Sequence, residues 1–230
     1  MADIQRIEDL ETRRFILDGL SKSYGLTQKR EGVHLSSLIY CLTKAFLDQN
    51  QTMGCTDEEV LLFSTGFGLE EVLIPKLFGV ECPLYFKDGI SYRPDFVLHA
   101  EEGIDSDKPS IMPYEIKSTR KGMKSYMGTI PEMWVIYQLA GCKIMEVNEY
   151  RLVGLLVSER PVPQLICETI IYEQGDIESN WEYILGRRDV YVEAMRSLKA
   201  PTPGKYCNDW ECKNCRYSIV CDAIAAYSQE

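Results

Sequence analysis

The chain has 230 residues, of which 45% are hydrophobic, and its formal net charge is −10. This length suits a single globular domain, and the acidic balance argues against a protein that coats nucleic acid through general positive charge. Apolar runs stay short of the ~18 residues needed to span a bilayer. Residues 1–6 lack the basic and apolar pattern of a secretory leader. We therefore expect a cytoplasmic protein with no membrane contact, in which thiols stay reduced.

Helical patterns fill the first third of the chain. Residues 1–30 are charged and predict helix, and a second helix is expected over 34–47 with Ser36 as its N-cap. A longer helix is predicted over 57–78, begun by Thr56 or by residue 57 itself. Two glycines inside it indicate close packing, namely Gly66 and Gly68.

Strand patterns follow in the middle of the chain. Residues 84–86, a turn at 87–89 and residues 90–99 predict a hairpin, and 100–110 predict a polar loop. The later elements are strands over 111–118, 152–157 and 165–172, and helices over 131–145 and 176–198. Helices first, strands in the middle and a late helix indicate an α/β fold.

Three charged residues fall in the predicted strands. Pro94-Asp95 is followed twenty residues later by Glu115-Ile116-Lys117. Side chains alternate along a strand, so Glu115 and Lys117 share one face, and Asp95 on a neighbouring strand can meet them there. Two carboxylates and the Ile116 carbonyl are oxygen ligands suited to Mg²⁺ or Mn²⁺. A cation held there activates water and polarises phosphate, and Lys117 stabilises the developing negative charge.

A Glu-x-Lys pair alone is more often an exposed ion pair on an edge strand. The Pro94-Asp95 dipeptide upstream makes the metal site the better interpretation of Glu115 and Lys117.

Nine cysteines are many for a chain of this kind. Cys212, Cys215 and Cys221 form a C-x₂-C-x₅-C pattern, which is a strong ligand signal in a reduced compartment. A fourth ligand is needed, and both Cys207 and Cys41 are candidates. From spacing alone, zinc held with Cys207 closes the shortest loop.

The charged residues resemble a known nuclease motif. Pro94-Asp95 with Glu115-x-Lys117 is similar to the PD-(D/E)xK signature, and Gly66 to Glu70 is similar to the Gly-x-x-x-His/Glu helix of its RecB-like branch. The resemblance implies that Glu70 contacts the metal, with Glu71 as a rival. It also implies a catalytic Gln138, although Cys142 stands where a tyrosine is usual.

The segment from Ser36 to Cys41 resembles the N-terminal helix of the CRISPR-associated exonuclease family known as the fourth Cas protein. That resemblance implies a RecB-like core with a mixed central sheet flanked by helices. It also implies a [4Fe–4S] cluster, here held by Cys41, Cys212, Cys215 and Cys221.

The implied organisation is one nuclease domain over 1–230. Residues 34–56 and 200–230 form an iron–sulfur lobe around a 57–199 core. The implied function is a metal-dependent DNA exonuclease acting on single-stranded ends. Its expected biology is prespacer processing with the spacer integrase complex, or a role in a virus or mobile element. Two alternatives stay open, a non-catalytic DNA- or partner-binding module with a vestigial site and a zinc-containing nuclease.

Other side chains carry weaker predictions. A basic stretch is a candidate DNA contact, formed by Arg120, Lys121 and Lys124 with Tyr126. Three tryptophans are expected in packing positions, namely Trp134, Trp181 and Trp210. Arg187, Arg188 and Arg196 are expected to be solvated. The remaining thiols are expected to be buried, namely Cys55, Cys82, Cys142 and Cys167.

Overall fold

The computed structural model describes residues 10–25, 31–50, 53–77, 82–99, 111–119, 130–157, 162, 164–213 and 215–227. The helices are α1 (Leu10–Ser23), α2 (Leu35–Ile39), α3 (Leu42–Asn50), α4 (Asp57–Leu77), α6 (Glu132–Met145), α7 (Gln174–Ser197), α8 (Asp209–Cys212) and α9 (Ser218–Tyr227). The strands are β1 (Val33–His34), β2 (Tyr85–Lys87), β3 (Ile90–Tyr92), β4 (Phe96–His99), β5 (Ile111–Thr119), β6 (Glu149–Leu156) and β7 (Gln164–Ile171). The predicted loop at 100–110 and the basic stretch at 120–126 lie outside the described residues.

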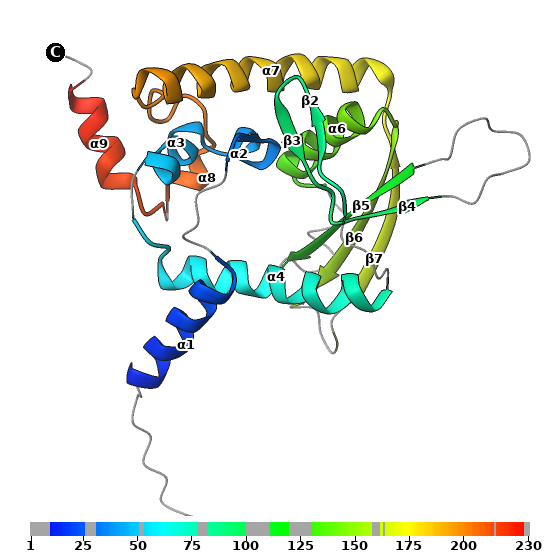
Figure 1. Ribbon diagram of the computed structural model, residues 1–230, viewed down its shortest axis with the longest axis horizontal. Helices are drawn as coiled ribbons and strands as arrows, with labels where there is room; N and C mark the ends of the chain where they lie inside the picture. The colour runs from blue at the N-terminus through cyan, green and yellow to red at the C-terminus, as the bar shows by residue number, and fades with distance from the viewer. Residues whose placement is uncertain are drawn as a thin grey trace, which may run out of the picture.

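The strands form two sheets, and the predicted α/β fold is confirmed. The larger sheet has the order β4-β5-β6-β7, with β5 and β6 parallel and the other neighbours antiparallel. The smaller sheet has the order β1-β3-β2. Helices α6 and α7 lie on one side of the larger sheet, and α4 runs along the other side (Figure 1). Within the described residues, none of the helices is long and apolar enough to cross a membrane.

The main hydrophobic core joins α2, α3, α6 and α7 to the smaller sheet. Close packing occurs at Gly141 on α6, where an added Cβ would lie 2.7 Å from the Tyr92 hydroxyl oxygen. The close packing predicted at Gly66 is wrong, because no atom of the described residues lies within 4 Å of a Cβ there. At Gly68 the same construction meets only the Tyr24 hydroxyl, at 3.5 Å.

The helix predicted over 34–47 is in fact two helices, α2 and α3, separated at Tyr40. Tyr40 is extended, with φ −95° and ψ −167°, and its carbonyl accepts a hydrogen bond from Arg187 Nη2 at 2.5 Å. The predicted N-cap at Ser36 is also wrong, since α2 begins at Leu35 and the capping residue is His34. The break leaves Cys41 outside both helices.

The start of α4 follows the prediction. Thr56 N–H donates to Glu59 Oε2 at 3.0 Å, and Glu59 N–H donates to Thr56 Oγ1 at 3.2 Å. This reciprocal capping box satisfies two backbone donors that the first turn of a helix leaves unpaired.

The strand predicted over 90–99 is two strands in different sheets. β3 ends at Tyr92 and β4 begins at Phe96. Proline has no N–H for the ladder, so Pro94 separates them. The hairpin itself is confirmed, because β2 pairs antiparallel with β3.

Three burial predictions are wrong. Arg187 is only 7% exposed because backbone carbonyls surround its guanidinium, whereas Trp210 on the short helix α8 is 59% exposed. Cys167 is exposed on β7. Trp181, by contrast, is buried as predicted.

Candidate active site and cysteine cavity

Pairing of β4 with β5 brings Asp95 opposite Glu115. Phe96 faces Tyr114 in the antiparallel register, and their rings stack with centroids 4.2 Å apart. One residue earlier, Asp95 N–H donates to the Tyr114 carbonyl at 3.2 Å. Asp95 Oδ2 accepts a hydrogen bond from Ile116 N–H at 2.6 Å. The two motif halves therefore meet across one pair of strands.

Glu115 is almost completely buried, at 3% exposure, and pairs with Lys117 two residues along the same face of β5. Its other carboxylate oxygen accepts a hydrogen bond from the Tyr150 hydroxyl at 3.3 Å. The Tyr150 hydroxyl is in turn hydrogen-bonded to the Tyr92 hydroxyl. Burial raises the pKa of both phenols well above the ordinary value, so both remain neutral hydrogen-bonding groups.

Sequence reasoning missed these two tyrosines. Tyr150 is the second residue of β6, which lies beside β5 only because α6 carries the chain back into the sheet. Tyr92 precedes Asp95 by three residues but belongs to the other sheet. Their apolar strand surroundings give no signal that the Tyr150 hydroxyl bonds Glu115 or that the Tyr92 hydroxyl bonds Tyr150.

The charges at this site perturb one another. Burial, then the neighbouring charge of Glu115, raises the pKa of Asp95 well above its usual range. Burial also raises the pKa of Glu70, with Glu115 adding to it. Burial alone would lower the pKa of Lys117, but the negative charges of Glu115 and Asp95 outweigh that and raise it. Lys117 is therefore an ammonium ion at neutral pH, unable to act as a base.

The donor set suits a hard divalent cation. Three carboxylates from α4, β5 and the start of β4 lie within electrostatic reach of one another, namely Glu70, Glu115 and Asp95. Oxygen ligands of this kind are those that Mg²⁺ and Mn²⁺ prefer. Across the described ranges, no group of three His, Cys, Asp or Glu side chains is already arranged to coordinate a metal ion. A cation binding here competes with Lys117 for Glu115 and with the Ile116 amide for Asp95.

Among the described residues, Gln138 makes no hydrogen bond to these carboxylates. It is fully buried on α6, its Oε1 accepts a hydrogen bond from the Tyr172 hydroxyl at 2.7 Å, and its Nε2 has no partner among the described residues. The preceding residue faces the site instead, since Lys117 Nζ lies 5.7 Å from the centre of the Tyr137 ring. Cys142, at the usual tyrosine position, is buried.

Five cysteines line a cavity of about 290 Å³ between the α2–α3 junction and the C-terminal tail, namely Cys41, Cys207, Cys212, Cys215 and Cys221. The Sγ atoms of Cys207 and Cys212 lie 3.5 Å apart. The structure thus brings both candidate fourth ligands to the three late cysteines. Glu211 links the two chain segments that carry these cysteines. Its Oε1 accepts a hydrogen bond from Cys41 N–H and its Oε2 accepts one from Asn208 N–H, each at 2.8 Å.

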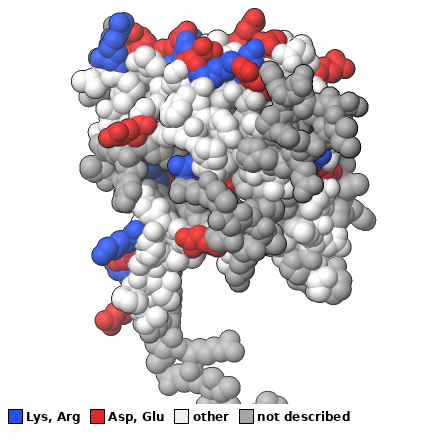
Figure 2. All heavy atoms as spheres, turned by 45° about the vertical axis from the view of Figure 1, so that its right-hand side comes forward, with Lys and Arg blue, Asp and Glu red and all other residues white. Residues whose placement is uncertain are grey.

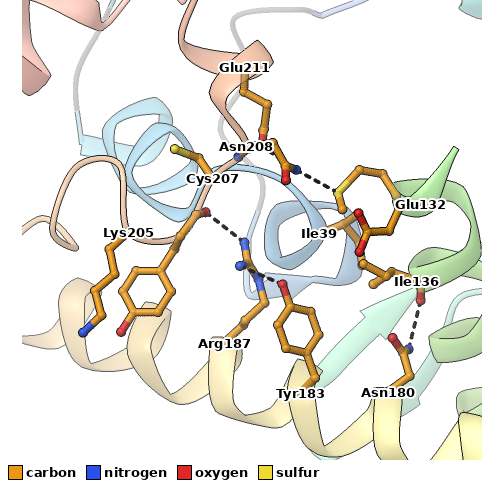
Figure 3. A pocket seen from close by; sticks show the side chains of 12 residues that line it. Ile39, Glu132, Ile136, Asn180, Tyr183, Arg187, Lys205, Cys207, Asn208 and Glu211 are labelled. Atoms are coloured by element: carbon orange, nitrogen blue, oxygen red, sulfur yellow. Dashed lines mark hydrogen bonds between the residues drawn. The ribbon is translucent and has the colours of Figure 1, made fainter.

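Arg187 holds together the backbone segments on either side of the cysteine cavity. Its guanidinium on α7 donates to the carbonyls of Leu38, Tyr40 and Tyr206 and to the Tyr183 hydroxyl. Figure 3 shows this guanidinium between Tyr183 and the tail segment that carries Cys207. A second cavity, of about 380 Å³, lies around it. A residue expected to be solvated therefore holds the break at Tyr40 in place.

The charged side chains in Figure 2 gather along the top of the molecule, over α7, with both signs interspersed. Below them, the described atoms on this face are mostly uncharged and form no continuous basic surface. The acidic net charge is thus not offset by a basic face in this view.

Comparisons with known proteins support the fold. No protein-family model and no curated protein matches the sequence. Among solved structures, the chain is similar to SSO0001 at a TM-score of 0.58 and 16% identity, over 92% of this chain and 96% of that one. It also matches an alkaline exonuclease, LHK-Exo, from Laribacter hongkongensis, at a TM-score of 0.45 and 11% identity, over 79% of this chain and 96% of that one. The complex of LHK-Exo with dAMP matches at a TM-score of 0.47 and 11% identity, over 77% and 94%. The first likeness shows a shared fold, and the other two fall below the similarity at which a fold can be argued.

Proposed function

We propose that the chain is a metal-dependent nuclease that hydrolyses phosphodiester bonds of DNA. The observation that carries the proposal is the meeting of Asp95 with the buried Glu115–Lys117 pair across β4 and β5. An ion pair serving stability alone is expected at an exposed edge, where its charges stay solvated. Here burial, together with the neighbouring charge of Glu115, raises the pKa of Asp95, an arrangement more typical of a functional site.

Each residue has a proposed role. Asp95 and Glu115 hold the cation, with Glu70 and the Ile116 carbonyl completing its oxygen shell. When bound, Mg²⁺ or Mn²⁺ polarises the scissile phosphate and makes water a better nucleophile. Lys117 remains protonated and stabilises negative charge on the phosphate oxygens. The Tyr150 hydroxyl orients Glu115 by hydrogen bonding one of its oxygens.

We further propose that Cys41, Cys212, Cys215 and Cys221 hold a [4Fe–4S] cluster joining residues 34–56 to residues 200–230. The C-x₂-C-x₅-C spacing and the sequence resemblance support this choice, and all four thiols line one cavity together with Cys207. Zinc held with Cys207 is the alternative, and in the cluster proposal Cys207 is a spare thiol.

The proposed biology rests on the sequence resemblance. It comprises trimming of single-stranded DNA ends during CRISPR adaptation, in contact with the spacer integrase complex. A virus or mobile element carrying the same chemistry is the alternative setting.

A second candidate function is a DNA- or partner-binding module whose nuclease site is vestigial. The hydrogen bonding of Gln138 favours it, because this residue bonds Tyr172 and, among the described residues, makes no hydrogen bond to the carboxylates. The two functions differ in whether the wild-type protein cleaves DNA.

One anaerobic preparation tests both proposals. We expect cleavage of single-stranded DNA with Mn²⁺, a loss of at least about a hundredfold in Asp95→Ala and Lys117→Ala, and full activity in the exposed controls Asp18→Ala and Lys199→Ala. Variants of Asp95 or Lys117 that cleave as well as wild type refute the site, and inactive wild-type protein favours the binding module. Iron analysis with an absorbance band near ~400 nm supports the cluster, whereas zinc without iron refutes it.

A further inference from the structure

Two aromatic side chains, Tyr40 and Trp210, lie together at the surface. Tyr40 is 40% exposed and Trp210 is 59% exposed. Their rings meet edge to face, with centroids 6.5 Å apart and an interplanar angle of 89°. An edge contact leaves ring faces open, and solvated aromatic faces of this size are available for another flat ring.

Helix α6 connects this pair to the carboxylate–lysine site. Asn208, the N-cap of α8, contacts Met133 Sδ on α6 at 3.5 Å, and one turn later Tyr137 has its ring centre 5.7 Å from Lys117 Nζ. Partial burial raises the pKa of the Tyr40 phenol, and the charges of Lys117 and Glu115 act on it as well. The reverse effect also holds, since the Tyr40 phenol contributes to the raised pKa of Lys117. Tyr40 and the residues proposed to act on phosphate therefore lie within electrostatic reach of one another.

Hydrogen bonds hold the backbone that carries both aromatic residues. The Tyr40 carbonyl accepts from Arg187, and the next amide, that of Cys41, donates to Glu211 on α8. Trp210 is on the same short helix, whose first turn is held by the hydrogen bond from Asn208 N–H to Glu211. Glu211 thus ties the two aromatic positions together across 170 residues of sequence separation.

Each aromatic residue also adjoins a thiol of the cysteine cavity. Tyr40 immediately precedes Cys41, and Trp210 is two residues before Cys212. A group bound by those thiols would fix the same two backbone segments, so cofactor content and the geometry of the aromatic pair are coupled.

We propose that Tyr40 and Trp210 form a base-stacking subsite for single-stranded DNA whose scissile phosphate lies at Asp95, Glu115 and Lys117. The subsite rests on the proposed nuclease function. Stacking on an aromatic side chain is open to every base, because each has a π-face, and it requires a strand whose bases are not already paired and stacked. The chain is acidic, and the described residues visible in Figure 2 form no continuous basic surface that could bind phosphate. Base stacking supplies affinity that does not depend on a positive surface.

The test is a binding measurement separate from cleavage. Fluorescence anisotropy of a labelled oligothymidylate is followed without added divalent cation, for wild type, Tyr40→Ala and Trp210→Ala. We expect each alanine variant to bind about tenfold more weakly, and Tyr40→Phe and Trp210→Phe to stay within about threefold of wild type. The matched control is Tyr227→Ala, which removes an aromatic ring that is 81% exposed on α9.

Loss of folding is distinguished from loss of stacking by a second readout. Oligothymidylate should quench tryptophan fluorescence in the wild type, and most of that quenching should disappear in Trp210→Phe while its affinity is kept. Circular dichroism and iron content matching the wild type are required of each alanine variant.

The outcomes separate this inference from the proposed function. Alanine variants that bind like wild type overturn the subsite even if the protein cleaves DNA, and so does a wild-type protein that binds no single strand. Stacking-dependent binding by a protein that never cleaves overturns the nuclease proposal and keeps the subsite.

Discussion

Arg216 is expected to be the ion-pair residue on which stability depends most. It lies between Cys215 and Cys221, its side chain is 9% exposed, and it pairs with Asp48 on α3 and Glu59 on α4. Breaking a buried ion pair by removing one partner costs about 3–5 kcal/mol. The lower end applies here, because the Asp48 side chain is 36% exposed and Glu59 keeps its 2.8 Å contact with Lys44.

Arg216→Met keeps most of the apolar stem and removes the charge, so we expect a loss of about 3 kcal/mol. For a chain of this size that corresponds to a fall in Tm of roughly 6–12 °C. The matched control is Arg196→Met, because both members of the Arg196–Glu193 pair are more than half exposed and such a pair contributes about 1 kcal/mol or less.

Calorimetry of both variants, as purified and after chelation, separates this effect from loss of a bound metal. A fall in Tm for Arg216→Met no larger than that for Arg196→Met, in both preparations, would refute the reasoning.

Two further predictions concern the carboxylate site. The raised pKa of Asp95 means that the folded apo-protein loses stability as pH rises from the ordinary value of 3.8 towards the raised one, because the unfolded chain releases its proton first. Asp95→Asn should therefore be inactive yet increasingly more stable than wild type as the pH rises above 3.8 without divalent cations. A Tm difference that does not change with pH contradicts it. Tyr150→Phe removes the hydroxyl that donates to Glu115 and should weaken Mn²⁺ activation of cleavage by about 10–100-fold, with little change in far-ultraviolet circular dichroism. Unchanged Mn²⁺ dependence would show that Tyr150 does not orient the carboxylate.

Elements with a local cause followed from the sequence. The capping box of Thr56 and Glu59 starts α4, and the Lys87-Asp88-Gly89 turn closes the β2–β3 hairpin, with Asp88 and Gly89 at positive φ. Both depend on residues within a few positions of one another, and sequence patterns report such interactions directly. Asp95, Glu115 and Lys117 could likewise be singled out, because charge inside an apolar strand is unusual.

Features made by distant residues did not follow from the sequence. The Tyr150 hydroxyl reaches Glu115, and the Tyr92 hydroxyl reaches that of Tyr150, only after two sheets have formed. In the sequence, Arg187 resembles a solvated helix residue. In the folded structure it donates to three carbonyls, two of which belong to residues about 150 positions earlier. Composition and periodicity carry no information about such partners.

The break at Tyr40 connects these observations. A continuous helix would have paired the carbonyls of Leu38 and Tyr40 within itself, so the buried Arg187 would have lost two of its acceptors. The break frees those carbonyls for the guanidinium and also releases the Cys41 amide for Glu211. It brings Cys41 to the cysteine cavity and the neighbouring phenol within reach of Lys117. The local cost of interrupting the helix is thus offset by contacts that join the cysteine cavity to the candidate active site, so disturbing either one should be felt at the other.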